Sequence, residues 1–158
     1  MMRLRWLTTA LASVAIAAIV AAPFAFAGDG SSGHARMKLI EKGTEFHFID
    51  VRAPAADGQA GDTITFGSTL HRWANGPAVG RLEGSCIQIR ADGTLDDCDV
   101  TVWVGARSFR MAGPFDPASG GQLSIVGGTA GWIGAGGTDR ISNNPDGTAT
   151  HVINLITD

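Results

Sequence analysis

Four histidines supply the side chains of this sequence best suited to binding a metal or moving a proton near neutral pH. His47, His71 and His151 fall in three different segments that look like strands, and His34 precedes them. Three imidazoles could meet across a closed sheet, but their spacing matches no metal-binding motif. We therefore expect no metal site and no cofactor, and we keep His47 and His151 as candidate ligand-binding residues.

The first 27 residues have the organisation of a secretory signal peptide. Arg3 and Arg5 precede an apolar run, and Ala25-Phe26-Ala27 forms an A-x-A cleavage site. An uncleaved membrane anchor is the alternative, but the polar stretch at 28–33 favours removal. We expect a secreted or extracytoplasmic protein without a membrane span after cleavage, with a flexible lead-in at 28–42 and one domain at 43–158.

The composition limits the classes of partner. Loss of Arg3 and Arg5 would leave ten Lys and Arg residues against fifteen Asp and Glu, a net charge near −5. Nucleic-acid binding is not expected, because phosphate contacts need clustered cations and those of this chain are scattered. The mature chain is long enough for a single hydrophobic core.

Cys86 and Cys98 are the two cysteines of the chain. The segment Ala91-Asp92-Gly93-Thr94 between them predicts a hairpin turn, so the thiols can face each other across two strands. A metal or redox pair is the alternative, but neither CxxC spacing nor a nearby histidine supports it. An exported chain makes a disulfide the default, and a loop this short should stabilise the fold by ~2–3 kcal/mol.

Short alternating segments separated by turn residues predict an all-β domain with eight strands. No segment is long enough for the helix of a βαβ unit, so a sandwich or an up-and-down barrel is expected. The predicted strands are 44–52, 62–73, 78–90, 99–105, 108–113, 122–127, 136–142 and 148–157.

The segment GQLSIVGGTAGWIGAGG at 121–137 decides between these two architectures. An apolar strand followed by Gly127, Gly128, Thr129 and the aromatic Trp132 resembles the signature of the allene oxide cyclase and dirigent superfamily. The order of Gly61-Asp62, Asn75-Gly76 and the two cysteines is similar to that of bacterial members. The arginine of the family's ARG motif is absent, because 135–137 reads Ala-Gly-Gly.

This resemblance implies an eight-stranded antiparallel up-and-down β-barrel with a hydrophobic interior. It implies a small hydrophobic ligand in the lumen, a dimer or trimer as the assembly, and a structural role for Trp132 in packing the loop around it. If the protein is an enzyme, the resemblance implies a cofactor-free isomerase or cyclase.

Asp50 is the candidate catalytic residue, because the segment 46–50 resembles the first strand of dirigent proteins, where aromatics precede a His-Asp pair. A carboxylate at the mouth of an apolar barrel could act as a general acid or orient a water. The alternative is an acid that caps the strand end. Phe48 and Trp103 are candidate ligand-binding aromatics. The sequence does not fix whether the strand face that carries Trp103 looks into the lumen or outward.

Two functions remain open at this level. One is an exported barrel that folds or positions an apolar molecule, as a cyclase or stereochemical guide does. The other is a non-catalytic structural or interaction barrel of the cell envelope. A ligand-sized cavity with a buried carboxylate or imidazole would favour the first, and a lumen filled by apolar side chains would favour the second.

Overall fold

A computed structural model describes residues 33–51 and 59–157, so the expected signal peptide lies outside the described residues. These residues form eight strands and a short 3-10 helix, η1 (Ala130–Trp132). None of them forms a helix long and apolar enough to span a membrane. The strands are β1 (Gly33–Ile49), β2 (Thr63–His71), β3 (Ala78–Gln88), β4 (Asp96–Val104), β5 (Arg107–Phe115), β6 (Gly121–Gly128), β7 (Gly136–Asn143) and β8 (Ala149–Thr157).

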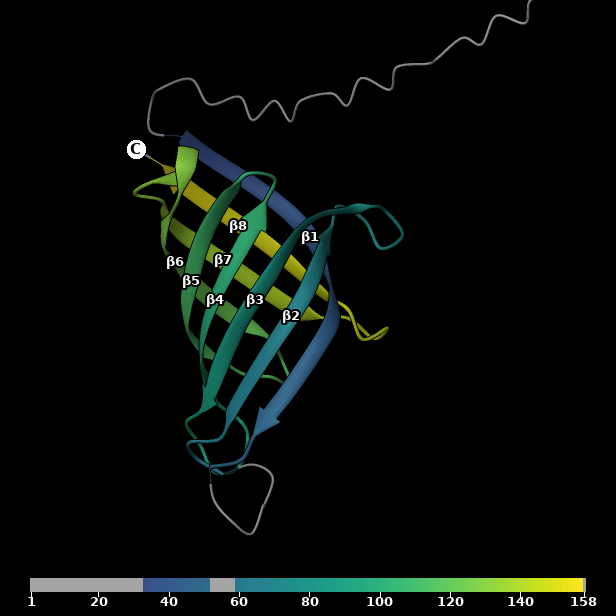
Figure 1. Cartoon of the computed structure of the whole chain (residues 1–158), viewed down its shortest axis with the longest axis vertical. Helices are drawn as coiled ribbons and strands as arrows, with labels where there is room; N and C mark the ends of the chain where they lie inside the picture. Colours follow the sequence, from purple (N-terminus) through teal and green to yellow (C-terminus); the bar gives the residue numbers. More distant parts are fainter. Residues whose placement is uncertain (1–32, 52–58, 158) are drawn as a thin grey trace, which may run out of the picture.

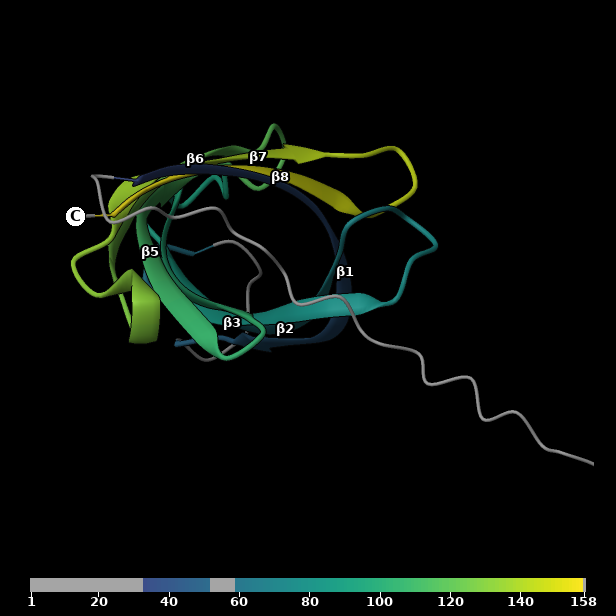
Figure 2. The same ribbon diagram turned by 90° about the horizontal axis from the view of Figure 1, so that it is seen from above.

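The strands form a closed barrel in which each is antiparallel to the next. Pairing of β1 with β8 completes the ring, and the view from the end shows the eight strands surrounding one interior (Figures 1 and 2). The predicted up-and-down barrel is therefore confirmed. Closure removes the exposed sheet edges that an open sheet would leave.

The first strand begins earlier than the sequence analysis placed it. Residues 33–42, expected to be a flexible lead-in, form the half of β1 that pairs with β8. Their pattern is period two, with Met37 and Leu39 buried inside the barrel and the charged Arg36 and Lys38 outside. Because of these outward-facing charges, the alternation of buried and exposed residues in 33–42 was not recognised as a strand from the sequence. After an irregularity between Gly43 and Glu45, the second half of β1 pairs with β2.

The interior of the barrel is divided along its length. Toward the end where β1 begins, apolar side chains from several strands pack inside the barrel, including Leu70, Ile153 and Leu155, each about 1% exposed. Trp132 of η1 is buried against Phe109 of β5, with ring centroids 5.6 Å apart in an edge-to-face arrangement. The aromatic of the glycine-rich segment therefore packs into the core.

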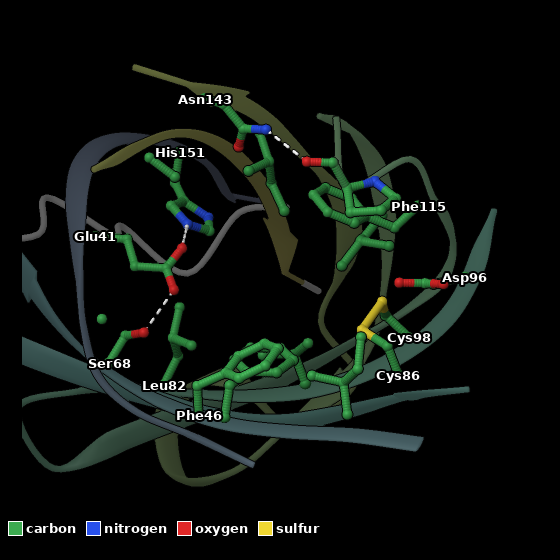
Figure 3. Close-up of a pocket in the computed structure, with 18 of the residues that line it drawn as sticks. Glu41, Phe46, Ser68, Leu82, Cys86, Asp96, Cys98, Phe115, Asn143 and His151 are labelled. Carbon is green, nitrogen blue, oxygen red and sulfur yellow. Dashed lines mark hydrogen bonds and ion pairs between the residues drawn. A yellow bond between two sulfur atoms is a disulfide. The ribbon is translucent and has the colours of Figure 1, made fainter. Parts of the chain in front are cut away.

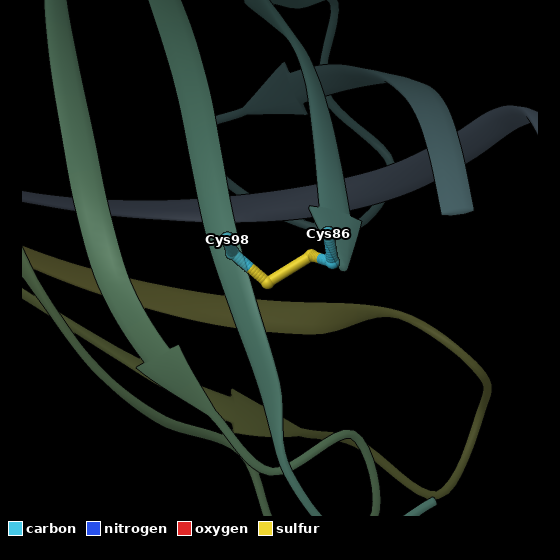
Figure 4. The surroundings of a disulfide bond; sticks show 2 residues. All are labelled: Cys86 and Cys98. Carbon is cyan, nitrogen blue, oxygen red and sulfur yellow. A yellow bond between two sulfur atoms is a disulfide. The ribbon is translucent and has the colours of Figure 1, made fainter. Parts of the chain in front are cut away.

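The hairpin of β3 and β4 carries the predicted disulfide between Cys86 and Cys98 (Figure 4). The two residues are direct partners in the antiparallel register, with Cα atoms 4.0 Å apart. Both side chains are buried and point into the barrel. The crosslink is therefore part of the inner wall.

Candidate functional site

The other end of the barrel encloses a cavity of about 600 Å³, in the size range of small-molecule sites. Apolar side chains make most of its floor and walls, among them Leu82, Val100, Met111, Leu123 and Ile141. The turns that follow β5 and β7 contribute Pro117 and Thr148 at its rim. Asn143 holds these two turns together by donating a hydrogen bond of 2.8 Å to the carbonyl of Pro117 (Figure 3).

A chain of hydrogen bonds crosses one wall of this cavity. Ser68 Oγ donates to Glu41 Oε1 at 2.6 Å, and His151 Nε2 lies 2.8 Å from Glu41 Oε2. The second ring nitrogen of His151, Nδ1, lies 2.6 Å from Asp139 Oδ2. Strands β2, β1, β8 and β7 thus each contribute one member, and Figure 3 shows Ser68, Glu41 and His151 side by side.

The residues of this hydrogen-bond chain are buried to different degrees. Asp139 and His151 are 0% and 1% exposed, whereas the side chain of Glu41 keeps 19% of its surface accessible. Asp139 Oδ1 is buried without a hydrogen-bond partner among the described residues. Of the two carboxyl groups in this hydrogen-bond chain, that of Glu41 is therefore the one that a molecule in the cavity can reach.

The two carboxylates keep His151 protonated. Burial alone lowers the pKa of His151, but the hydrogen bonds and charges of Asp139 and Glu41 outweigh it and raise this pKa to about 9. The pKa of Glu41 shifts in the opposite direction. Burial raises it, but the hydrogen bonds and charge of His151 and the hydrogen bond from the Ser68 hydroxyl outweigh burial, so the pKa of Glu41 lies below its ordinary value. At neutral pH an imidazolium therefore lies between the carboxyl groups of Glu41 and Asp139, beside the cavity.

This charge state decides what the cluster can do chemically. An imidazolium that donates both N–H groups to carboxylates cannot accept a proton from Ser68, so Ser68 is not an activated nucleophile. Glu41, by contrast, has lone pairs beyond its two hydrogen bonds and faces the cavity. It can accept a hydrogen bond or a proton from a bound molecule, or hold a cation.

A second carboxyl lies on the wall across the cavity from Glu41. Asp96, the first residue of β4, is 2% exposed and lines the cavity next to the disulfide (Figure 3). Its Oδ1 has no hydrogen-bond partner in the described part of the chain. Burial, and then the charge of Asp116, raises the pKa of Asp96 above its ordinary value.

Of the candidate site residues proposed from sequence, the structure places only His151 on the cavity wall. Trp103 lies on the outer face of β4, because Val100, Val102 and Val104 take the inner face, and its ring packs under the guanidinium of Arg81 at 4.2 Å. The sequence left open which face of this strand looks inward, and the structure places Trp103 on the outer face.

The candidates at the end of β1 also lie outside the cavity lining. His47 and Phe48 are exposed, and Asp50 follows the last residue of β1. The cavity instead receives residues from the middle of β1, Glu41 to Phe46, because the strand begins earlier than expected. His71 contacts Thr69 and the carbonyl of Gly76, so the three strand histidines do not converge.

Sequence reasoning missed Glu41, Ser68, Asp96 and Asp139. Period two gives a signal for Glu41, which continues the inward series of Met37 and Leu39. Asp139 shares a face of its strand with Ile141, but the sequence does not say that this face looks inward. Within the described residues, no group of three or more His, Cys, Asp or Glu side chains has an arrangement that could hold a metal ion.

No protein-family model matches the chain, and no curated protein matches it by sequence. Solved structures do match. Pyocyanin demethylase has a TM-score of 0.65 at 21% identity, over 77% of this chain and 99% of that one. A pterocarpan synthase dirigent protein has a TM-score of 0.66 at 12% identity, covering 83% and 88%.

A Diels–Alderase from Streptomyces koyangensis has a TM-score of 0.65 at 16% identity, over 82% of this chain and 70% of that enzyme. At these identities the likeness establishes the fold. It confirms, at the level of the fold, the resemblance to the allene oxide cyclase and dirigent-like barrels that the glycine-rich segment indicated.

Proposed function

We propose that this chain is an exported barrel that binds a small, mainly apolar molecule in its lumen and positions it for a cofactor-free isomerisation or cyclisation. The cavity is of ligand size and mostly apolar, and one wall offers the carboxylate of Glu41. Proteins that share the fold carry the names of a dirigent protein and a Diels–Alderase. An apolar enclosure contributes to such reactions by holding a flexible substrate in one conformation.

The observation that carries the proposal is the charged chain of Asp139, His151 and Glu41 on the cavity wall. Burying three ionisable groups is costly, and an apolar set of similar volume commonly gives an equally stable fold. A purely structural barrel has no need of such a chain. A barrel that must keep one carboxylate ionised in an apolar lumen does need it, because the imidazolium stabilises that charge.

The alternative function is a non-catalytic structural or interaction barrel of the cell envelope. It is favoured by a lumen that side chains fill, whereas this lumen contains a cavity of ligand size. A homodimer or homotrimer, and export itself, stay predictions from the sequence.

Binding can be measured with N-phenylnaphthylamine, an apolar fluorophore with one N–H donor that brightens in apolar sites. We expect saturable binding to the wild type. Glu41→Gln should weaken it roughly fivefold to tenfold, because a hydrogen bond to a charged acceptor is replaced by a neutral one. Ile64→Trp, which enlarges a side chain of the cavity wall, should abolish it.

Glu83→Gln is the matched control, since Glu83 is exposed on the outer face of β3 and pairs with Arg81. It should bind the probe as the wild type does. Equal binding by the wild type, Glu41→Gln and Ile64→Trp would place the probe outside the lumen and contradict the proposal.

A further inference from the structure

The first half of β1 has one edge without a strand partner in the described chain. Residues 33–39 pair with β8, whereas pairing with β2 begins only at Ile40, opposite His71 at the end of β2. The backbone N–H and C=O groups of 33–39 that point away from β8 therefore have no neighbouring strand to pair with. This half of β1 is a stretch of free sheet edge, although the barrel as a whole is closed.

A second hollow, of about 370 Å³, lies along this free edge, and we call it the edge hollow. Four consecutive residues of β1, Arg36 to Leu39, line it. Successive side chains of a strand point to opposite faces, so a hollow that touches four in a row lies beside the strand and not on one face of it. From across the gap it is lined by Arg72, which follows β2, by Val79 of β3 and by Val104 of β4. It shares no lining residue with the cavity at the other end of the barrel.

The lining of the edge hollow has an apolar part and a cationic part. Met37, Leu39 and Val104 are buried and supply the apolar part. Arg36 and Lys38 are exposed, and because they are two positions apart they project from the same face of β1. Arg72 is a third cation at the hollow, although it also interacts within the chain.

The two hollows of the barrel differ in charge. Neither Lys nor Arg is among the described residues that line the larger cavity, which has the carboxyl of Glu41 on its wall. The described lining of the edge hollow contains three basic side chains and no acidic one. A concave site lined by one sign of charge attracts ligands of the opposite sign. The edge hollow therefore favours an anion.

The two cations of β1 and the apolar lining indicate the class of this anion. A phosphate monoester has a charge of about −1.5 to −2 at pH 7 and three acceptor oxygens, so it can meet both Arg36 and Lys38, whereas a carboxylate has one charge. Arg and Lys both bind phosphate through charge-assisted hydrogen bonds. The four residues of β1 at the hollow are fewer than the ~5–6 of a typical strand, so the hollow suits a small molecule better than an added peptide strand.

We infer that the edge hollow binds an organophosphate, with its phosphate group at Arg36 and Lys38 and a small apolar body against Met37 and Leu39. This site is additional to the cavity of the proposed function and does not depend on it. The same head group occurs in free organophosphates and in anionic phospholipids such as phosphatidic acid. Charged side chains also protect a free sheet edge from pairing with another chain, and that role alone predicts no phosphate binding.

Calorimetric titration with 1-naphthyl phosphate tests the site, with 1-naphthylacetate as the singly charged analogue and 1-naphthalenemethanol as the neutral one. We expect the phosphate to bind about fivefold more tightly than the acetate, and the neutral analogue to bind most weakly. Salt screens exposed charges, so raising NaCl from ~20 mM to ~300 mM should weaken phosphate binding several-fold. Equal affinities for the phosphate and the acetate would contradict the assignment of a phosphate.

Substitution of the two cations tests their role. Arg36→Gln and Lys38→Gln should each weaken binding of 1-naphthyl phosphate about twofold to fivefold, and the double variant should lose about tenfold. Arg110→Gln is the matched control, because Arg110 is exposed on the outer face of β5 and pairs with Asp99. It removes the same charge elsewhere and should bind as the wild type does.

Filling the edge hollow gives an independent test. Val79→Trp should abolish binding of 1-naphthyl phosphate and leave binding of N-phenylnaphthylamine unchanged, because Val79 lines only the edge hollow. Melting curves of every variant establish that it is folded.

Vesicles of phosphatidylcholine with and without phosphatidic acid distinguish the two sources of the head group. Binding of 1-naphthyl phosphate without binding of either vesicle would support a free organophosphate as the ligand. Additional binding of the vesicles that contain phosphatidic acid, lost in the double variant, would support a lipid head group at the same site. Binding of these vesicles without any binding of 1-naphthyl phosphate would show a membrane-binding surface and overturn the inference.

The remaining outcomes separate the edge hollow from the lumen. Equal binding of 1-naphthyl phosphate by the wild type and the double variant would overturn the inference. Loss of that binding in Ile64→Trp, with binding kept in the double variant, would place the anion in the lumen and overturn it as well. Failure of N-phenylnaphthylamine to bind, while 1-naphthyl phosphate binds, would reject the proposed function and leave the edge hollow standing.

Discussion

His151 Nε2 lies 2.8 Å from Glu41 Oε2, although 110 positions separate the two residues in the chain. They come from β8 and β1, the two strands whose pairing closes the barrel. The contact therefore forms only when the first and last strands meet. The strand pairing that closes the sheet thus also forms the hydrogen-bonded wall of the cavity.

Removal of the imidazolium should be strongly destabilising. His151→Gln would leave the carboxylates of Asp139 and Glu41 buried without their common cation. We expect the free energy of unfolding, measured in urea, to fall by about 3–5 kcal/mol. The triple variant Glu41→Gln, Asp139→Asn, His151→Gln should lose less than His151→Gln alone. A loss below about 1 kcal/mol in the single variant would show that the cluster is not ionised.

The raised pKa of His151 predicts a fall in stability at alkaline pH. Its pKa is about 9 in the fold and 6.5 in the unfolded chain, so the folded state binds more protons between these values. The stabilisation is complete below pH 6.5 and is lost as the pH rises through about 9, by an amount on the order of 3 kcal/mol. Urea denaturation at successive pH values measures it.

The matched variant for this pH series is His151→Gln, which lacks the imidazole that titrates in that window. Its free energy of unfolding should be nearly flat between pH 6.5 and 9. An identical slope in both proteins would assign the titration to another group.

The disulfide should stabilise the barrel modestly. Cys86 and Cys98 are 12 positions apart, so the crosslink constrains a short loop of the unfolded chain. Replacing both by Ser should cost about 2–3 kcal/mol and lower the melting temperature without abolishing the fold. Calorimetry of the variant and of the reduced wild type measures the effect, and equal melting temperatures with and without the crosslink would contradict it.

The strands could be predicted from local signals, and the resemblance of the glycine-rich segment indicated the barrel. Turn residues such as Asp92-Gly93 and the alternating segments placed all eight strands, and the hairpin aligned the two cysteines. The parity of the apolar residues changes between Leu82 and Ile87, with Gly84 between them, a pattern that indicates a bulge or a barrel corner. The register there is regular, and a Cβ at Gly84 would lie 2.7 Å from the carbonyl oxygen of Asp99, so the glycine permits a close approach of two strands.

The site could not be predicted in the same way. Which face of a strand looks inward depends on the register of its neighbours, and this placed Trp103 outside and Asp139 inside. The pairing of β1 with β8 joins the two ends of the domain, and no local signal reports it. Glu41 was missed because the segment before Thr44 has too many charges to look like a strand.

The glycine pair that replaces the end of the ARG motif gives the sharpest test of the backbone. Gly137 has φ +126°, and a Cβ there would lie 2.0 Å from the carbonyl oxygen of Asn154 on β8. Gly136 has open space within 4 Å of its Cβ position. Both residues belong to β7, so they make a matched pair of neighbouring positions.

We expect Gly137→Ala to reduce the free energy of unfolding by at least ~2 kcal/mol, because alanine disfavours this φ and its methyl group would push β8 away from β7. Gly136→Ala should change it by less than about 0.5 kcal/mol. Since β8 carries His151, the displacement in Gly137→Ala should also weaken ligand binding in the cavity. Urea denaturation and probe titration of both variants measure these effects. Equal stability of the two would show that β7 and β8 do not approach each other as closely as the structure has them.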